Sequence, residues 1–583
     1  MTPALYYAAM TRRRLSYLIT AAILVIVFAA LLALDLSQRG LAWRIFYDLT
    51  GEEAPLAQVR GMVEWAGNLT RPQPNTDANI PISHAGVNPL GINTFLQQEV
   101  EPARREQQLQ MIADAGFVWI RQQFPWEDIE IHGRGDFTDR RNDLNGDGTP
   151  DPVDAWLKYD NIVDLAEQYG VQIIARLDAA PNWSHADPQE GTFPPPDDFQ
   201  DYVNYAVAVA TRYQGRILYY QIWNEPNIYP EWGTQPVNPE AYTEMLCRTY
   251  TALKAVDPEI VVIAGALSPT VALNAYNLSE FVYLQRMYDA GAADCFDIMS
   301  VQGYGFYSGP TDQRLRTTTL NFGRHTYVRD IMVANGDADK AIWVSEAAWN
   351  PVNSPDVSPD VVGRENYGAV TQEQAADYMP QAYERAESDW PWLGVVNYWF
   401  FKRATDTERN LPFYYFRMVE PDFTPLPVYE AMRNFDLPRV LYHGVHQADH
   451  WAITGEEAVP IQTAAGAQFG EASLVESAPV NAYGTHVTIR WKGERLQVFE
   501  IVDAIPIADY VSPNPDEWTE TEIHASLWAT TVRYGISSDA PFLLDSITVS
   551  DRTIPQLTPI IGTVVALLIT GIGAMVGYLW RKS

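Results

Sequence analysis

Short apolar runs rich in β-branched residues alternate with amphipathic helical patterns through the middle of the chain. The apolar runs predict eight strands, at residues 90–95, 117–121, 171–177, 217–223, 260–265, 296–301, 341–345 and 395–399. Apolar positions at helical spacing predict helices between them, among them 104–115, 156–169, 202–213, 241–256 and 372–388. Repeated strand–helix units predict the α/β class, and here a (β/α)8 TIM barrel over residues 86–436. The main rival is a doubly wound open sheet, which normally has a glycine-rich phosphate turn after its first strand, and the sequence has none.

The start of the chain is apolar. Residues 15–34 carry no charge, follow a triplet of arginines and are long enough to cross a bilayer as one helix. A cleaved signal peptide is the competing interpretation, although no small-x-small cleavage site follows. Residues 35–85 are expected to form a stem or linker, because the stretch 68–81 within them is rich in Pro, Asn and Thr and has no clear period.

The end of the chain is apolar as well. Residues 557–580 are uncharged and precede the basic pair Arg581 and Lys582, so they predict a second transmembrane helix, with a buried core helix as the rival. The positive-inside rule places residues 1–14 and the C-terminus in the cytoplasm. The expected location is the cell membrane, with the catalytic domain extracytoplasmic.

Beyond residue 436 the helical period fades. Strands are predicted at 485–491, 496–502, 530–534 and 542–549, with turn residues between them. They predict a β-sandwich over residues 437–552. The stretch PFLLDSITVSDR resembles the closing strand of jelly-roll modules that are often attached to glycoside hydrolases. A spacer between barrel and membrane and a sugar-binding module are both open interpretations.

Charge and cysteine content narrow the classes of function. The 40 Lys and Arg against 73 Asp and Glu give a net charge of −33, which argues against a nucleic-acid partner. Two cysteines, Cys247 and Cys295, exclude a disulfide scaffold and a four-cysteine zinc site, and whether they pair is open. The 18 Trp, 32 Tyr and 21 Phe supply flat faces that suit sugar rings, although most aromatic side chains are core in any protein.

Two glutamates follow predicted strands that lie across a barrel mouth from one another. Glu225 follows the fourth strand in YYQIWNEPN, and Glu346 follows the seventh in AIWVSEAAWN. Barrel enzymes place their chemistry at the carboxyl ends of the strands. Two carboxylates facing across a cleft are what glycosidic hydrolysis needs, and a separation near ~5 Å accompanies retention of configuration.

The block from Trp223 to Pro226 resembles the acid/base motif of clan A retaining glycoside hydrolases, together with the glutamate that ends strand seven. The resemblance covers about residues 86–436 and is closest to families 39 and 5 and to bacterial membrane-anchored relatives. It implies that Glu225 is the general acid/base, that Glu346 is the nucleophile and that Asn224 binds the sugar 2-hydroxyl. The implied activity is cleavage of β-linked O-glycosidic bonds in an extracellular oligosaccharide or polysaccharide by double displacement, without a catalytic cofactor.

Further positions support the same site. By the resemblance, Arg121 steadies the nucleophile, Tyr304 forms a hydrogen bond to it and Trp399 forms the floor of the sugar subsite. Gln302 and Asp178 stand where family 5 commonly has histidine, which is a departure from that family. Four more tryptophans follow strands at the same barrel face, so that at least one is expected to stack on a sugar: Trp126, Trp183, Trp232 and Trp349.

The loop after the second strand carries a separate motif, DLNGDGTPDPVD, at residues 143–154. Its oxygen-bearing residues have the spacing of a calcium loop, with Gly148 at the tight turn and Thr149 offering its carbonyl. The predicted ligands of a structural Ca²⁺ are Asp143, Asn145, Asp147, Thr149, Asp151 and Asp154. A polar surface turn is the alternative.

Other functions share some of these residues. A glycan-binding sensor without turnover keeps the fold but usually loses one carboxylate, and both are present here. A transglycosylase that remodels cell-surface polysaccharide shares every residue named above and differs only in excluding water from the acceptor subsite. A structural surface protein predicts that both glutamates can be replaced without consequence. Sugar, linkage, endo or exo action, oligomeric state and protein partners do not follow from the sequence.

Overall fold

The computed structural model describes residues 3–77, 80–188, 191–438, 440–447, 453–454, 461–463, 466–469, 475–481, 485–500, 505–523, 531–540 and 542–551. The predicted C-terminal membrane segment, residues 557–580, lies outside the described residues.

Eight parallel strands form the central sheet, in the order β7-β6-β5-β2-β1-β10-β9-β8. Parallel bridges Ile263–Ile298 and Leu267–Val301 join β7 to β8, which closes the sheet into a barrel. This confirms the predicted TIM barrel, and each predicted strand overlaps an observed one. The strands are β1 (Leu90–Thr94), β2 (Trp119–Pro125), β5 (Gln172–Asp178), β6 (Tyr219–Asn224), β7 (Val261–Ala266), β8 (Met299–Gln302), β9 (Ile342–Ala347) and β10 (Leu393–Tyr398).

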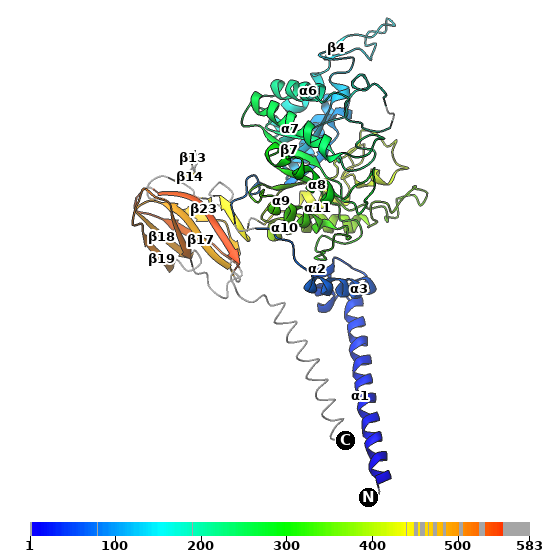
Figure 1. Ribbon diagram of the computed structural model, residues 1–583, viewed down its shortest axis with the longest axis vertical. Coiled ribbons are helices and arrows are strands. Elements are labelled where there is room, and N and C mark those ends of the chain that lie inside the picture. The colour runs from blue at the N-terminus through cyan, green and yellow to red at the C-terminus, as the bar shows by residue number, and fades with distance from the viewer. Residues whose placement is uncertain are drawn as a thin grey trace.

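Helices surround the barrel and cover the outer face of its sheet (Figure 1). Several begin at a capping side chain: Asp198 caps α6, Asn238 caps α7, and Thr371 forms a capping box with Gln374 at α10. The helices are α4 (Pro102–Asp114), α5 (Leu157–Gln168), α6 (Phe199–Arg212), α7 (Pro239–Val256), α8 (Glu280–Asp289), α9 (His325–Ala334), α10 (Gln372–Asp389) and α11 (Pro427–Arg433). Short 3-10 helices lie in the loops at Leu96–Gln98, Trp126–Asp128, Asn182–Ser184, Ala292–Cys295, Phe322–Arg324 and Pro412–Phe416, and the loop after β2 holds the hairpin β3 (Thr138–Asp139) and β4 (Val153–Asp154).

The inside of the barrel is layered. Large apolar side chains pack near the amino ends of the strands, including Trp119, Ile174 and Trp343. The next layer towards the carboxyl ends is polar and buried: Gln221 accepts from Arg121 Nε at 2.6 Å and donates to Ser300 and Ser345 at 2.7 and 2.8 Å. A fully bonded polar layer in a low-dielectric interior is rigid, so it fixes the side chains above it.

The segment predicted to be a stem or linker is helical and packs on the barrel. It holds α2 (Leu41–Thr50), α3 (Pro55–Ala66) and a short 3-10 helix, Gly67–Thr70. Gly51 ends α2 with φ of 63°, and a Cβ there would lie 2.6 Å from the carbonyl oxygen of Gly309. Arg314 pairs with Glu52 at 2.9 Å and with Glu64 at 3.1 Å. The prediction failed because these helices are stabilised by contacts with the distant loop after β8, which a local pattern does not contain.

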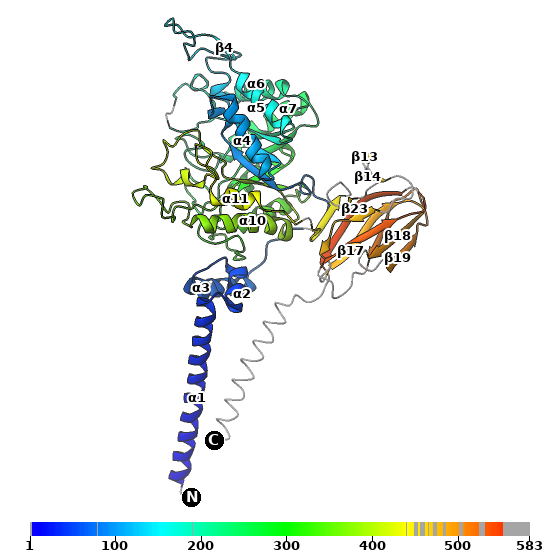
Figure 2. The same cartoon turned by 180° about the vertical axis from the view of Figure 1, so that it is seen from behind.

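Two antiparallel sheets follow the barrel and lie beside it (Figure 2). Residues from both sheets share one apolar core, including Trp491, Val498 and Leu544, so the predicted sandwich is confirmed. One sheet has the order β13-β14-β23-β17-β20, with β11 paired to β23, and the other β12-β15-β22-β18-β19. The strands are β11 (Gly444–Gln447), β12 (Ile453–Thr454), β13 (Ile461–Thr463), β14 (Gly466–Phe469), β15 (Val475–Ser477), β17 (Thr485–Lys492), β18 (Arg495–Glu500), β19 (Ile505–Val511), β20 (Thr519–Ile523), β22 (Tyr534–Ser537) and β23 (Phe542–Asp551), with β16 (Val480–Asn481) pairing β21 (Thr531–Val532).

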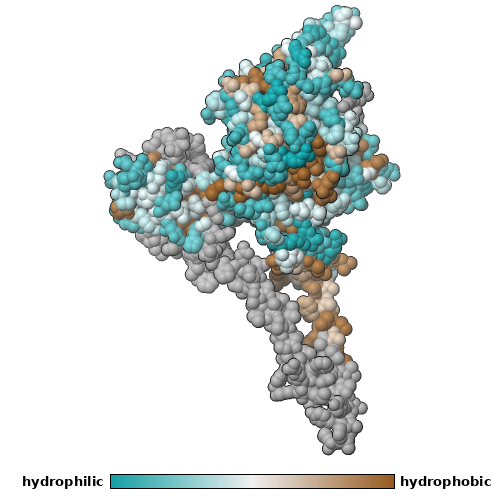
Figure 3. Space-filling view, viewed as in Figure 1, coloured by the Kyte–Doolittle hydropathy of each residue, from teal (hydrophilic) through white to brown (hydrophobic). Residues whose placement is uncertain are grey.

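A helix, α1 (Pro3–Ser37), projects from α2 and α3 (Figure 1). Its described apolar side chains are largely exposed, for example Leu24 at 64% and Phe28 at 68%, and this part of the surface is brown in Figure 3. Within the described residues, no helix taken singly has the length and hydropathy of a membrane span. The pair Ala22–Ser37 and Leu41–Thr50, bent by 72°, has them together.

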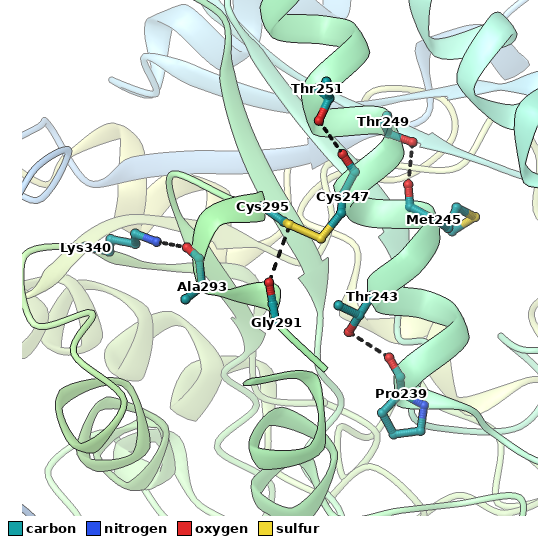
Figure 4. Close-up of a disulfide and its surroundings, with 10 residues drawn as sticks. All are labelled: Pro239, Thr243, Met245, Cys247, Thr249, Thr251, Gly291, Ala293, Cys295 and Lys340. Atoms are coloured by element: carbon teal, nitrogen blue, oxygen red, sulfur yellow. Dashed lines mark hydrogen bonds between the residues drawn. A yellow bond between two sulfur atoms is a disulfide. The ribbon is translucent and has the colours of Figure 1, made fainter. Parts of the chain in front are cut away.

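The two cysteines form a disulfide. Cys247 on α7 bonds Cys295 at the end of the 3-10 helix Ala292–Cys295, across a sequence separation of 48 (Figure 4). The bond ties α7 to the segment that leads into β8, so the pairing that the sequence left open is made within the barrel domain.

Candidate active site

The carboxyl ends of β6 and β9 bring Glu225 and Glu346 to the same cleft. The cleft has a volume of about 1220 Å³, and both glutamates line it. Glu346 lies within β9 next to the end of β8, where its partner in the register is Gln302. Glu225 follows β6 directly, and its N–H donates to the carbonyl of Ala266 on β7 at 2.9 Å.

Glu346 is buried and receives a hydrogen bond on each carboxylate oxygen. Arg121 Nη1 donates to Oε1 at 2.9 Å, and the Tyr304 hydroxyl donates to Oε2 at 2.6 Å. Burial, with the charge of Arg176 adding to it, lowers the pKa of Arg121 to about 10, so Arg121 stays cationic at neutral pH. Burial and the nearby Glu346 charge hold the pKa of Tyr304 well above its usual value, so its phenol remains a donor. Both contacts stabilise negative charge on Glu346.

Glu225 has the opposite environment. Burial raises the pKa of Glu225 to about 8, and the charges of Glu346 and Glu231 act in the same direction. At neutral pH it is therefore largely protonated. Glu225 is therefore placed to give a proton, whereas Glu346 receives hydrogen bonds from Arg121 and Tyr304, a contrast that suits an acid and a nucleophile.

Asn224 precedes Glu225 and is fixed from two sides. Its Oδ1 accepts from Arg121 Nη2 at 2.8 Å, and its Nδ2 donates to Glu231 Oε2 at 3.4 Å. Arg121 thus contacts both Asn224 and Glu346, and it also donates to Asn93 on β1 at 2.8 Å. The guanidinium fork sets the geometry of the site by binding side chains from several strands.

Aromatic rings line the rest of the cleft. Trp399, just after β10, is partly exposed there, and its ring is T-shaped to that of Phe95, with centroids 5.5 Å apart. Tyr367 and Phe416 line the cleft too, with ring centroids 6.1 Å apart. Apolar faces beside polar groups suit sugar rings, which have one apolar and several polar sides.

Three of the other predicted sugar-stacking tryptophans are buried in the core, and Trp183 is partly exposed and packs against that core, which corrects the prediction. Trp126 is buried, stacks on Tyr205 at 5.3 Å and donates its N–H to Glu130. Trp183 packs edge-on against Trp126 at 5.4 Å. Trp349 is buried and donates to the carbonyl of Ser308 at 2.6 Å, and Trp232 is buried as well. Among the described residues that line the cleft, none of these four appears. All four rings pack against other aromatic rings, and the N–H groups of Trp126, Trp183 and Trp349 already donate to protein oxygens.

The structure adds residues that the sequence did not single out as site residues. Glu231 and Arg176 line the cleft, and so does Gln123, which donates to Asp178 at 2.8 Å. Arg176 is also paired with Asp178 at the end of β5. Glu231 follows the catalytic motif by only a few residues, but a carboxylate in a proline-containing turn is usually solvated, so the local pattern did not distinguish it.

The calcium motif is an exposed loop. Its carboxylates accept backbone hydrogen bonds: Gly146 and Gly148 donate to Asp143 at 2.7 and 2.8 Å, and Asn145 donates to Asp151 at 3.0 Å. Asp154 accepts from the N–H of Trp156 at 3.0 Å. In the part of the chain that the structure describes, no three acidic, histidine or cysteine side chains are grouped as a metal site would need. Calcium binding by this loop stays a prediction, and no catalytic step depends on it.

Comparison with known proteins decides the class. Residues 82–317 match the model of the family described as Cellulase (glycosyl hydrolase family 5). This barrel is a clan A glycoside hydrolase domain, and the protein is a glycosidase. The match ends before β9, so in this hydrolase domain Glu346 is assigned by its contacts rather than by the family match. No curated protein sequence matches the chain.

Solved structures with a likeness to the glycosidase have low identity. A family 39 glycoside hydrolase from Bacteroides cellulosilyticus is 16% identical, with a TM-score of 0.44, covering 79% of this chain and 82% of its own. A monomeric β-xylosidase from Caulobacter crescentus is 13% identical, with a TM-score of 0.41, covering 80% and 99%. An exo-β-1,4-mannosidase from an Opitutaceae bacterium is 15% identical, with a TM-score of 0.41, covering 62% of each chain.

Proposed function

We propose that this glycosidase is a retaining enzyme that cleaves β-linked O-glycosidic bonds of an extracytoplasmic oligosaccharide or polysaccharide. The observation that carries the proposal is the contrast between the two carboxyls. Glu225 holds its proton at neutral pH, whereas Glu346 receives charge-stabilising hydrogen bonds from Arg121 and Tyr304. One group is ready to give a proton and the other to donate an electron pair.

The reaction has two steps. In the first, a Glu346 oxygen bonds to the anomeric carbon while the glycosidic C–O bond breaks, and the leaving oxygen takes the proton of Glu225. In the second, Glu225, now a carboxylate, takes a proton from water, whose oxygen displaces Glu346 from the anomeric carbon. Asn224 Nδ2 is placed to donate to a sugar hydroxyl beside the reacting carbon. The second inversion restores the starting configuration.

The test uses the full chain in detergent on aryl β-glycosides and on plant, fungal and bacterial polysaccharides. Glu346→Ala should abolish sugar release. Glu225→Ala should lose on the order of 10²–10⁴-fold on substrates with poor leaving groups and less on activated aryl glycosides, because only the former need the acid. NMR of the first-formed anomer decides between retention and inversion. Release by wild-type protein of the inverted anomer would overturn the double displacement.

The same experiment separates the alternatives. Binding of glycan by wild-type protein with no release from any substrate would favour a sensor that lacks turnover. Longer oligosaccharides in place of hydrolysis products would favour a transglycosylase. Sugar release that is unchanged in Glu346→Ala would remove the hydrolytic role of the site.

We further propose that the catalytic domain lies outside the cytoplasm and is held at the membrane by the ends of the chain. The disulfide between Cys247 and Cys295 supports this location, because such bonds persist in oxidising compartments. The exposed apolar side chains of α1 support an anchor. Protease added to intact cells should digest the domain without lysis. Protection until the cells are lysed would contradict the proposed orientation.

A further inference from the structure

Glu231 holds both residues that precede the acid/base. The indole N–H of Trp223 donates to the backbone carbonyl of Glu231 at 2.8 Å, and Asn224 Nδ2 donates to its carboxylate at 3.4 Å. The intervening turn is closed from inside as well: Ile228 N–H donates to the Glu225 carbonyl at 3.1 Å, and Glu231 N–H donates to the Ile228 carbonyl at 3.0 Å. The chain therefore folds back so that Glu231 lies against the corner that presents Glu225.

This corner needs support because its backbone is unusual. Trp223 has φ of 70° and Glu225 has φ of 42°, and neither is a glycine. Side chains with a Cβ rarely adopt this region, and such conformations persist only where surrounding contacts over-determine them. The two bonds to Glu231 are contacts of that kind.

The carboxylate of Glu231 also determines which way the Asn224 amide faces. Arg121 offers only donors, so it requires the amide oxygen, and the Glu231 carboxylate offers only acceptors, so it requires the amide nitrogen. The reversed amide would place two donors together at Arg121 and two acceptors together at Glu231. The observed orientation keeps the amide nitrogen, with its second N–H, on the side of Glu231, which lines the cleft.

We propose that Glu231 is a positioning residue for glycoside hydrolysis, which fixes the Asn224 amide through its carboxylate and supports the Glu225 corner through its carbonyl. This inference rests on the proposed function of the site. The charge of Glu231 adds a second effect. It lies near Arg176 and Asp178 from β5, Glu346 from β9 and Glu225 of its own turn. Burial raises the pKa of Glu231 to about 7, so Glu231 is mostly ionised in the pH range where Glu225 loses its proton. Its negative charge in that range helps to keep the proton on Glu225, since like charges nearby disfavour ionisation.

Two variants separate these effects. Glu231→Leu keeps the backbone carbonyl and the bulk of the side chain but removes its oxygens, so Asn224 loses its second partner. We expect kcat/KM to fall on the order of 10-fold, mainly through kcat. Glu231→Gln can still accept from Asn224, so it should restore most of the rate. Because it lacks the charge, it should move the basic limb of the kcat/KM profile to lower pH.

A double-mutant cycle with Asn224→Ala tests whether Glu231 acts through Asn224. In the Asn224→Ala background, Glu231→Leu should cost almost nothing further. An equal loss in both backgrounds, or a basic limb that does not move in Glu231→Gln, would overturn the proposal. Glu127→Gln is the matched control for charge, because Glu127 is an exposed carboxyl that lines the same cleft and whose electrostatic neighbours are Asp128, Asp178 and Arg141.

The order of measurement keeps the two proposals distinguishable. Wild-type turnover is measured first. Its absence would contradict both the proposed hydrolysis and the role of Glu231. Thermal unfolding of each variant shows whether it folds. If Glu231→Leu does not fold, Glu231→Gln is used to test the proposal. Turnover that is normal in Glu231→Leu, with loss in Glu346→Ala, would overturn the positioning role alone.

Discussion

Arg121 on β2 and Tyr304 in the loop after β8 act on the same carboxylate, and each supplies one of its hydrogen bonds. The two donors are not equivalent. Arg121 also orients Asn224 and Asn93, so its removal disturbs several side chains, whereas the Tyr304 hydroxyl has Glu346 as its partner. Tyr304 therefore gives the cleaner measure of how much a single donor contributes to the charged nucleophile.

Tyr304→Phe should lower kcat by about 10- to 100-fold, the size expected for about 1.5–3 kcal/mol from a hydrogen bond to a charged group. The ring packing against Phe416 is kept, with centroids now 5.5 Å apart. Steady-state kinetics on an aryl glycoside gives the measurement. Tyr307→Phe is the control, because Tyr307 is exposed and donates to the carbonyl of Glu365. Equal effects of the two variants would argue against a role for the Tyr304 hydroxyl.

The protonation of Glu225 sets the basic limb of the pH profile. Its raised pKa, about 8, means that the proton is retained at neutral pH and is lost as the pH rises through that value. We expect kcat/KM to be maintained through neutrality and to fall above about pH 8. A basic limb near pH 5 would show that Glu225 is solvated like an ordinary glutamate.

At the scale of elements, α2 and α3 belong to the catalytic domain through the loop between β8 and α9. Gly309 N–H donates to the Gly51 carbonyl at 2.7 Å, and Gln313 N–H donates to the Leu49 carbonyl at 3.1 Å. The same loop carries Tyr304 into the cleft. The segment nearest α1 therefore supports the loop that positions the nucleophile.

Arg314→Met should loosen this support. Arg314 is largely buried among three carboxylates, Asp312, Glu52 and Glu64, which would be left facing one another. We expect a loss on the order of 2–3 kcal/mol, below the value for a fully buried pair because Glu52 and Glu64 retain some solvent. Hydrogen exchange should increase over residues 303–321. Arg60→Met is the control, since Arg60 is 78% exposed and its ion pair is with Glu64. Protection in this loop that is equal in both variants would contradict the docking role.

At the scale of the whole molecule, the disulfide fastens α7 to the entry of β8 and closes a long stretch of chain (Figure 4). The double variant Cys247→Ser, Cys295→Ser should unfold about 3–5 °C below wild type, given about 2–4 kcal/mol from such a cross-link in a domain of this size. Activity at 25 °C should remain, because neither cysteine lines the cleft. Calorimetry compares the Tm of the disulfide-bonded chain with its Tm after a reductant is added. An unchanged Tm would show that the disulfide adds no stability.

The sequence by itself determined the barrel, its strand positions and the two glutamates. Strand and helix periods are local, and a barrel places the end of every strand at one face, so Glu225 and Glu346 could be matched without coordinates. The sequence also predicted Arg121, Tyr304 and Trp399 at this face, and the structure brings all three to Glu346 or to the cleft.

Other features follow only from the folded structure. They are the aromatic rings that remain in the cleft and the pairing of Cys247 with Cys295. They also include the docking of the helices in residues 41–70 on the barrel and the position of Glu231 beside the acid/base. Each depends on a contact between segments far apart in the chain or on how one turn folds back. Trp126 is core because Tyr205 covers it, and α2 is stabilised because Gly309 approaches Gly51. The period of apolar residues in the sequence indicates which face of a helix or strand is buried. It does not indicate which segment packs on that face, because that depends on the whole fold.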